Sequence, residues 1–227
     1  MKPFIRYIVS SLLFVLAFQN ASAQDSLQVE KPNERSFSIL LATDYGKLAT
    51  TAAKLDTRYE FNIGIQFTQH IRLIADYGYA QLAPSNAIEN GNYTSTGNYY
   101  RAGLEYIINI VPKTYLSFGG MYANSTFTDE GTIEIKSEIW PSLNENFVRD
   151  GFSANWAEFV LTSETTIFNR DKGFVSNLYW GIKFRLRFMI EKPTPEQFDI
   201  YAIPGFGRTF NNIVPAVNLF VAYKMNW

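Results

Sequence analysis

Nine charged residues could carry chemistry in this chain because they recur at alternate positions of short segments. They are Arg72, Asp76, Arg101, Glu105, Glu158, Glu164, Lys183, Arg185 and Arg187. Alternate residues of a β-strand point to the same face, so each segment would gather its charges on one side. Acidic and basic groups gathered in this way can transfer protons, or they can neutralise one another as ion pairs.

Glu158 and Glu164 are the carboxylates that most resemble an acid–base pair. Three basic residues, Lys183, Arg185 and Arg187, are expected on the same face of a neighbouring segment. A carboxylate beside such cations stays ionised and paired with them. We therefore interpret the two glutamates as structural ion-pair partners, and we expect no catalytic residues.

His70 is the only histidine, and the chain has no cysteine. A histidine metal cluster is therefore excluded, and so are disulfides and a cysteine-linked lipid. His70 lies beside a predicted short turn, which favours a polar turn residue over a catalytic base. Four carboxylates of a later connection could attract Ca²⁺, but their spacing fits no known calcium loop: Asp129, Glu130, Glu134 and Glu138. We expect neither a metal nor a cofactor.

The charged residues belong to segments in which apolar and polar residues alternate with a period of two. This pattern is typical of β-strands with unlike faces, and it is clearest at 178–188. Segments 59–67 and 70–79 show it too and are separated by a tight break, which predicts a hairpin. We predict an all-β chain with eight antiparallel strands, at 36–43, 59–67, 70–79, 100–110, 114–123, 156–167, 178–188 and 217–227.

Three features favour a membrane barrel over a water-soluble one. The predicted connections after strands two, four and six are short, whereas the other four are long. Most strands reach the roughly 9 to 11 residues that cross a bilayer. Aromatic residues lie near the strand ends on the apolar face, where they anchor at membrane interfaces. We predict an eight-stranded antiparallel transmembrane β-barrel with short periplasmic turns and long extracellular loops.

Two of the long connections contain patterns of their own. Residues 132–139 alternate within the connection 124–154, which predicts an extension of the barrel wall or a small outer hairpin. Residues 201–210 combine a Pro-Gly pair with aromatic side chains, which predicts an ordered turn over the barrel mouth.

An outward apolar face would place the nine charged residues inside the barrel. The hairpin registers then predict the cross-strand pairs Arg72 with Glu105, Asp76 with Arg101, and Glu158 with Lys183 or Arg185. Four glycines would also face inward and leave room for arginine side chains: Gly64, Gly78, Gly103 and Gly181. Because the interior of eight strands is just wide enough for side chains, we predict a plugged, charge-paired lumen.

The start of the chain has the pattern of a secretory signal peptide. The basic residues Lys2 and Arg6 precede an apolar run from Ile8 to Phe18, and the small residues Ala21-Ser22-Ala23 follow it as a cleavage site. The run is shorter than the roughly 20 residues that a spanning helix needs. We predict three parts, which are a signal peptide at 1–23, an N-terminal tail at 24–35 and a barrel domain at 36–227.

Several motifs of the chain resemble an uncharacterised family of bacterial outer-membrane β-barrel proteins that carries only a domain-of-unknown-function label. The motifs are 99–103, 155–160, the basic run 183–187 and 203–210. The resemblance covers most of the mature chain, implies the barrel fold and supplies no activity. The last residue, Trp227, resembles the C-terminal signal by which such barrels are recognised for assembly.

These observations lead to a non-enzymatic protein of the Gram-negative outer membrane. We expect a structural or docking role through the extracellular loops, with outer-membrane lipid and the barrel-assembly machinery as partners and no nucleic acid, because no basic patch occurs. One alternative is an eight-stranded enzyme that acts on lipid through Ser137, Glu134 or Glu138. A second alternative is a periplasmic soluble barrel that binds a small apolar ligand.

Overall fold

The computed structural model describes residues 37–53, 56–84, 87–88, 90–135, 143–168, 173–195 and 199–226. The predicted signal peptide, the N-terminal tail, Trp227, and Ser137 and Glu138 of the alternative enzyme site lie outside the described residues. Within the described residues, no helix has the length and apolar character to cross a membrane.

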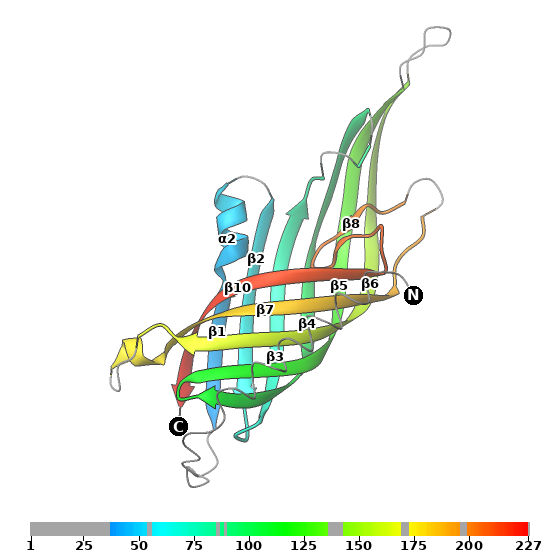
Figure 1. Ribbon diagram of the computed structural model, residues 1–227. Coiled ribbons are helices and arrows are strands. Elements are labelled where there is room, and N and C mark those ends of the chain that lie inside the picture. The colour runs from blue at the N-terminus through cyan, green and yellow to red at the C-terminus, as the bar shows by residue number, and fades with distance from the viewer. Residues whose placement is uncertain are drawn as a thin grey trace, which may run out of the picture. The chain divides into compact units, whose positions relative to one another are not determined.

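Eight strands form one antiparallel sheet that closes into a ring (Figure 1). Each strand pairs with its neighbours in the chain, and the first and last strands close the ring by pairing from Ser38–Asn226 to Asp44–Phe220. The predicted all-β chain with eight antiparallel strands is therefore confirmed. The ring strands are β1 (Ser38–Asp44), β2 (Thr57–Gln66), β3 (Ile71–Leu82), β4 (Gly91–Val111), β5 (Thr114–Ile135), β6 (Leu143–Thr166), β7 (Leu178–Glu191) and β10 (Ile213–Asn226).

Within the described residues, four small elements lie in the connections. Helix α2 (Tyr45–Ala52) joins β1 to β2 and was not expected from the sequence. It begins at Asp44, whose side chain accepts a hydrogen bond from the backbone N of Lys47 at 3.1 Å, the standard N-cap contact. The others are η1 (Phe174–Asn177) and the paired strands β8 (Ala202–Ile203) and β9 (Gly207–Arg208).

The connections after β2 and β4 are short, as predicted, but the prediction of a short connection after β6 was wrong, because 167–177 separate β6 from β7 and include η1. Two of the connections predicted as long are mostly strand. Strand β4 begins at Gly91, and β5 and β6 continue to Ile135 and from Leu143. Strands β4, β5 and β6 therefore extend beyond the rest of the ring at the end that we call the mouth (Figure 1). The predicted loop 124–154 was wrong in extent, whereas the predicted extension of the wall is confirmed as far as Ile135.

A buried ion pair explains why this extension is ordered. Asp129 of β5 is fully buried and accepts two hydrogen bonds from Arg149 of β6, at 2.9 Å and 2.5 Å. Tyr93 of β4 donates a third to the same carboxylate at 3.1 Å. These three side chains join all three strands of the extension. The strands therefore pair there although apolar and polar residues alternate less regularly than in the rest of the ring.

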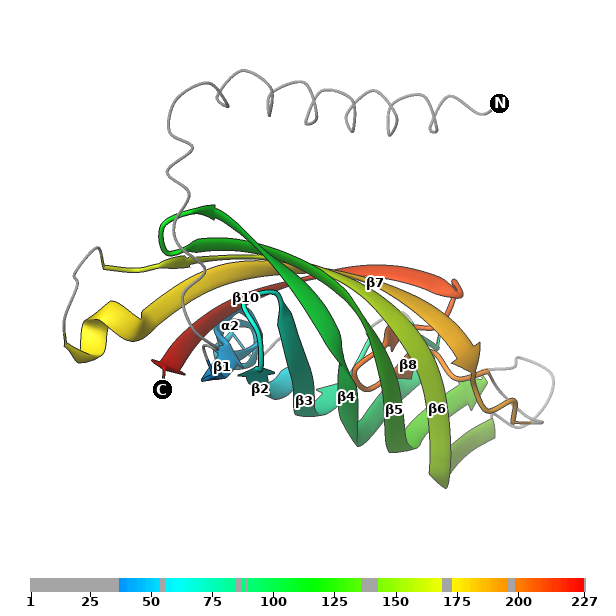
Figure 2. The ribbon, with the colours of Figure 1, turned by 90° about the horizontal axis from the view of Figure 1, so that it is seen from below.

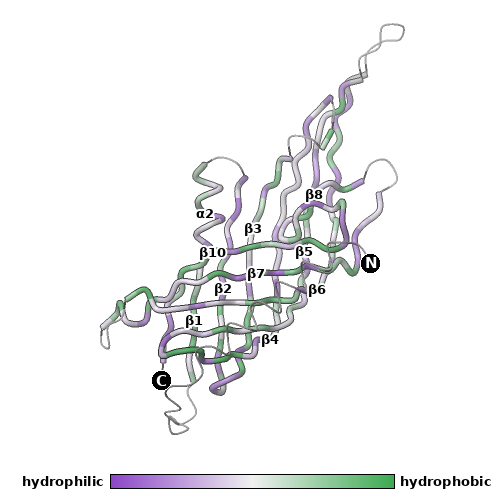
Figure 3. The backbone as a smooth tube through the Cα atoms, viewed as in Figure 1, coloured by the Kyte–Doolittle hydropathy of each residue, from purple (hydrophilic) through white to green (hydrophobic). Residues whose placement is uncertain are grey.

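The two faces of the ring differ in polarity as the alternation predicted. Hydrophilic and hydrophobic residues follow one another along the strands (Figure 3). Every ring strand exposes a large apolar side chain on the outside, namely Leu41, Phe61, Leu73, Leu104, Phe118, Phe159, Ile182 and Val217. The inward face of β3 reads Arg72, Ile74, Asp76, all buried. The ring thus has an apolar exterior and a largely polar interior.

The interior of the ring is layered. Buried Ile74, Met121 and Val160 form an apolar layer between two charged clusters. A larger apolar cluster, which includes Trp156 and Phe206, fills the mouth. Met121 of β5 is an apolar side chain on the inward, mostly polar face. The sheet curves around the β8–β9 segment when it is seen from below (Figure 2).

The inward glycines make room for rings more often than for arginines. A Cβ atom at Gly64 would lie 2.9 Å from Cδ of Arg72, as predicted. At Gly78 and Gly181, however, a Cβ atom would collide with the rings of Tyr99 and Phe220. The prediction that these glycines make room for arginine was therefore wrong at both positions, because aromatic side chains also point inward. It was also wrong at Gly103, where a Cβ atom would collide with the backbone of Gly120 and with Met121.

Gly119 and Gly120 provide a test of how tightly neighbouring strands of the sheet are packed. A Cβ atom at Gly119 would collide with the carbonyl oxygen of Leu104, whereas the nearest atom at Gly120 would be 3.9 Å away. Gly119→Ala should lower the free energy of unfolding by about 1 to 3 kcal/mol through overpacking. Gly120→Ala should change it by less than about 0.5 kcal/mol. Thermal unfolding followed by circular dichroism measures both, and equal melting temperatures would contradict the packing described.

Candidate functional site

The most prominent polar site is a cluster of five charged side chains inside the ring, which we call the mouth cluster. It contains Glu60, Asp76, Arg101, Glu158 and Arg185. Arg101 contacts the three carboxylates at 2.7 Å, 3.4 Å and 2.8 Å, in that order. Arg185 contacts the same three at 3.6 Å, 2.6 Å and 2.7 Å. Two guanidinium groups from β4 and β7 therefore share carboxylates from β2, β3 and β6.

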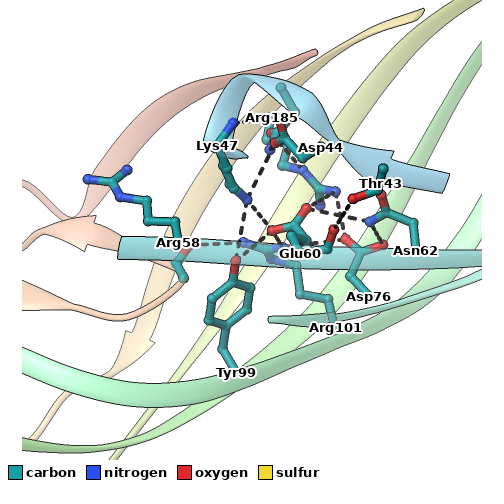
Figure 4. A network of polar contacts seen from close by, with 12 residues as sticks. Thr43, Asp44, Lys47, Arg58, Glu60, Asn62, Asp76, Tyr99, Arg101 and Arg185 are labelled. Atoms are coloured by element: carbon teal, nitrogen blue, oxygen red, sulfur yellow. Dashed lines mark hydrogen bonds and ion pairs between the residues drawn. The ribbon is translucent and has the colours of Figure 1, made fainter. Parts of the chain in front are cut away.

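Neutral side chains donate further hydrogen bonds to each carboxylate of the mouth cluster. Tyr99 donates to Glu60 at 2.7 Å, and Trp156 donates to Glu158 at 2.6 Å. The amide of Asn62 donates to Asp76 at 2.6 Å (Figure 4). Buried carboxylates need such donors because burial removes their water.

Helix α2 adds a cation to the mouth cluster. Lys47 forms an ion pair with Glu60 and lies 3.6 Å from Asp44 (Figure 4). Burial lowers the pKa of Lys47 to about 8, although the carboxylates of Glu60 and Asp44 oppose the shift. Because this pKa still exceeds 7, Lys47 carries a positive charge at neutral pH.

A second charged cluster lies nearer the short turns. Arg72 binds Glu105 at 3.0 Å and Glu164 at 3.0 Å. Ser117 and Thr162 donate hydrogen bonds to Glu105 at 3.2 Å and 3.1 Å. Lys183 is farther away, at 3.9 Å from Glu105. This cluster links β3, β4, β5 and β6 across the interior.

The β8–β9 turn enters the mouth and binds the mouth cluster through its backbone. Arg101 donates a hydrogen bond to the carbonyl oxygen of Gly205 at 3.0 Å. Arg187 donates to that of Phe206 at 2.6 Å. The ring of Phe206 is fully buried and lies edge-on to Trp156, with centroids 5.7 Å apart. The predicted ordered turn over the mouth is therefore present.

All nine charged residues singled out from the sequence lie in the interior, each at most 8 % exposed. The predicted pairs are confirmed for Arg72 opposite Glu105 and for Asp76 opposite Arg101. The predicted register of Glu158 was wrong, because it lies opposite Arg187 rather than Lys183 or Arg185. The strands end at Thr166 and resume at Leu178, and their register is centred later in the chain than predicted, although the guanidinium of Arg185 still reaches Glu158.

Sequence reasoning missed several members of the site. Glu60 has the inward parity of its strand, alternating with outward Tyr59 and Phe61, so the pattern itself could have identified it. Lys47 and Asp44 could not be placed in this way because they lie on or beside α2, outside the alternating segments. Their roles depend on how that connection folds back into the mouth.

The arrangement is suited to holding the ring together rather than to proton transfer. The mouth-cluster carboxylates are engaged by arginines and neutral donors, so none of the three is available as a base. His70 lies in the short turn between β2 and β3, where its ring stacks on Tyr106 with centroids 5.4 Å apart. Within the described ranges, no three acidic or histidine side chains come close enough to hold a metal ion.

Glu158 is the residue with which to test the mouth cluster, because three arginines surround it. Glu158→Gln removes one buried charge and leaves its partners uncompensated, so it should reduce stability by about 3 to 5 kcal/mol. Glu130→Gln, on an exposed position of β5, is the matched control and should be nearly neutral. Thermal unfolding of the purified variants measures both. Equal stability of the two would show that the cluster does not hold the ring together.

Gly205 tests the docking of the β8–β9 turn. Its φ is +82°, and a Cβ atom there would lie 2.5 Å from the ring of Tyr99. Gly151 also has a positive φ, +73°, but no atom lies within 4 Å of its Cβ position. Both alanine variants incur about 1 to 2 kcal/mol of backbone strain, and only Gly205→Ala adds the collision. Hydrogen exchange at residues 203–208 should accelerate in Gly205→Ala alone, whereas acceleration in both would argue against the contact.

Comparison with known proteins places the chain in a family without assigning an activity. No curated protein matches the sequence. A model of the domain of unknown function DUF6048 matches residues 2–225, which is nearly the whole chain. The resemblance to an uncharacterised family with such a label is thereby confirmed, and no catalytic residues come with it. The chain belongs to the DUF6048 family.

Proposed function

We propose that the ring is a transmembrane β-barrel of the bacterial outer membrane with a plugged, ion-paired interior and no enzymatic activity. The observation that carries this proposal is the reversed polarity of the ring. All eight strands expose large apolar side chains outward, whereas the buried interior contains the nine charged residues. Water-soluble monomers rarely expose apolar patches larger than a few hundred Å². Contact with lipid would remove that cost.

The backbone of the ring is also compatible with lipid. In a bilayer every N–H and C=O group needs a partner within the protein, and a closed sheet supplies them. The antiparallel strands pair continuously around the ring. Strands β3, β7 and β10 contain 12, 14 and 14 residues, more than the roughly 9 to 11 that cross a bilayer.

Outward aromatic residues lie near both ends of the strands, as two membrane interfaces require. Tyr77, Tyr100 and Tyr122 are exposed toward the mouth. Tyr106 and Trp180 are exposed toward the opposite end, and the exposed aliphatic residue Leu104 lies between Tyr100 and Tyr106 on β4. In this placement the short turns would be periplasmic and the mouth extracellular.

The packed interior supports a plug rather than a pore. The cavity between the two charged clusters has a volume of about 10 Å³, which is room for about one water molecule. Aromatic side chains and the β8–β9 turn fill the mouth above it. We propose that the protein acts through the surface of its extracellular end, in a structural or docking role, after insertion by the barrel-assembly machinery.

The two alternatives are less well supported. A soluble barrel that binds an apolar ligand would need its apolar face inward, opposite to the polarity of this ring. A lipid enzyme would need a nucleophile and a base near the mouth, whereas His70 lies at the opposite end.

Substitution of outward residues separates lipid from water as the surroundings of the ring. Leu104 is 56 % exposed on the wall of the ring, and Val148 is 70 % exposed on the extension beyond it. Arginine at a lipid-facing position near the membrane midplane costs about 2 to 4 kcal/mol. Leu104→Arg should therefore reduce the amount of folded protein in the outer membrane, and Val148→Arg should not.

The readout is the outer-membrane fraction of cell envelopes, run on gels with and without boiling. A folded barrel should migrate differently from the boiled chain. A protein that is soluble without detergent and tolerates both arginine substitutions equally would overturn the membrane proposal.

A further inference from the structure

A small cavity at the mouth is lined by three cationic side chains from three different elements. Lys47 comes from α2, Arg58 from β2 and Arg187 from β7. The cavity has a volume of about 30 Å³, and its remaining walls are Ala80, Leu82, Tyr99, Gly205 and Gly207. Among the described residues, no acidic side chain lines it.

Two of these cations present donors that lack an acceptor. Nε of Arg187 has no hydrogen-bond partner, although the side chain is at least nine-tenths buried. The nearest carboxylate oxygen, from Glu158, is 3.6 Å away. Nε of Arg58 is also buried and without a partner. Buried polar groups of this kind are normally satisfied, so each unsatisfied one calls for an explanation.

The carboxylates that balance these cations lie outside the cavity wall. Lys47 pairs with Glu60, and Arg58 pairs with Asp56 at 2.5 Å, yet neither carboxylate lines the cavity. Lys47 is protonated at neutral pH, as described above. The wall of the cavity therefore contains three cationic groups and no carboxylate, while the carboxylates that partly balance them lie behind the wall.

We propose that this mouth cavity binds a phosphate group. Guanidinium groups offer several donors in one plane and an ammonium group offers a compact charge, the combination that phosphate oxygens favour. A volume of about 30 Å³ exceeds the room for one water molecule and is too small for a sugar ring. Arg58 is 38 % exposed, so the site is open toward the outside.

Position 207, on the wall of the cavity, has a φ of +103°, which favours glycine. The phosphate could be free in solution or could belong to a lipid headgroup. The inference concerns the mouth alone and does not depend on where the ring is located in the cell.

The test is a calorimetric titration of the full-length protein, folded in a neutral detergent, with inorganic phosphate. Arg58→Met should weaken binding at least tenfold, because Arg58 lines the cavity but is outside the mouth cluster. Arg208→Met is the matched control, since Arg208 is exposed on β9 and does not line the cavity. Its Kd should stay within twofold of the unmodified protein. Lys47→Met should also weaken binding.

A parallel titration uses mixed micelles with phosphatidic acid, compared with micelles that contain diacylglycerol instead. Binding of phosphatidic acid alone, lost in Arg58→Met, would support the site and identify a lipid headgroup as its ligand. Binding of inorganic phosphate with the same dependence on Arg58 would support the site with a free anion. Equal Kd values for Arg58→Met and Arg208→Met, or no binding in either titration, would overturn the proposal.

Discussion

The structure depends on the neutralisation of buried charge inside the ring. Arg101 and Arg185 share the carboxylates of Glu60, Asp76 and Glu158, and these five residues come from five different strands. Removing ions from water is costly, and only close, multiple pairing offsets that cost. The cluster is therefore complete only when strands distant in the sequence have come together. The buried charges are therefore satisfied only in the assembled sheet.

The same constraint organises what surrounds the cluster. Apolar layers above and below exclude water from the ion pairs and strengthen them, since electrostatic interactions grow as the local dielectric falls. The β8–β9 turn supplies backbone carbonyl oxygens to Arg101 and Arg187. N–H groups of these arginines that do not bind carboxylates therefore hold the turn in the mouth. Because Gly205 has no side chain, this turn packs directly against the ring of Tyr99.

Polarity inside and polarity outside are linked by the alternation of the strands. Because neighbouring residues point to opposite faces, an interior rich in charge leaves the intervening apolar residues on the exterior. A ring of this kind is better matched to lipid than to water, which is the basis of the proposed membrane location. At the mouth, where several strands end, the cationic side chains of Lys47, Arg58 and Arg187 line a small cavity.

The sequence by itself determined the central segments of the eight strands, the face that each residue of those segments takes and, for the hairpin of β3 and β4, which residues lie opposite. It thus predicted the pairs of Arg72 with Glu105 and Asp76 with Arg101. It did not show that β4, β5 and β6 continue into the predicted loops. Only the tertiary structure decided the contacts across the interior, such as Arg72 with Glu164, and the entry of Lys47 and Gly205 into the mouth. A period of two fixes the direction of a side chain, but it contains no information about which strand lies across a closed ring or how a connection folds back.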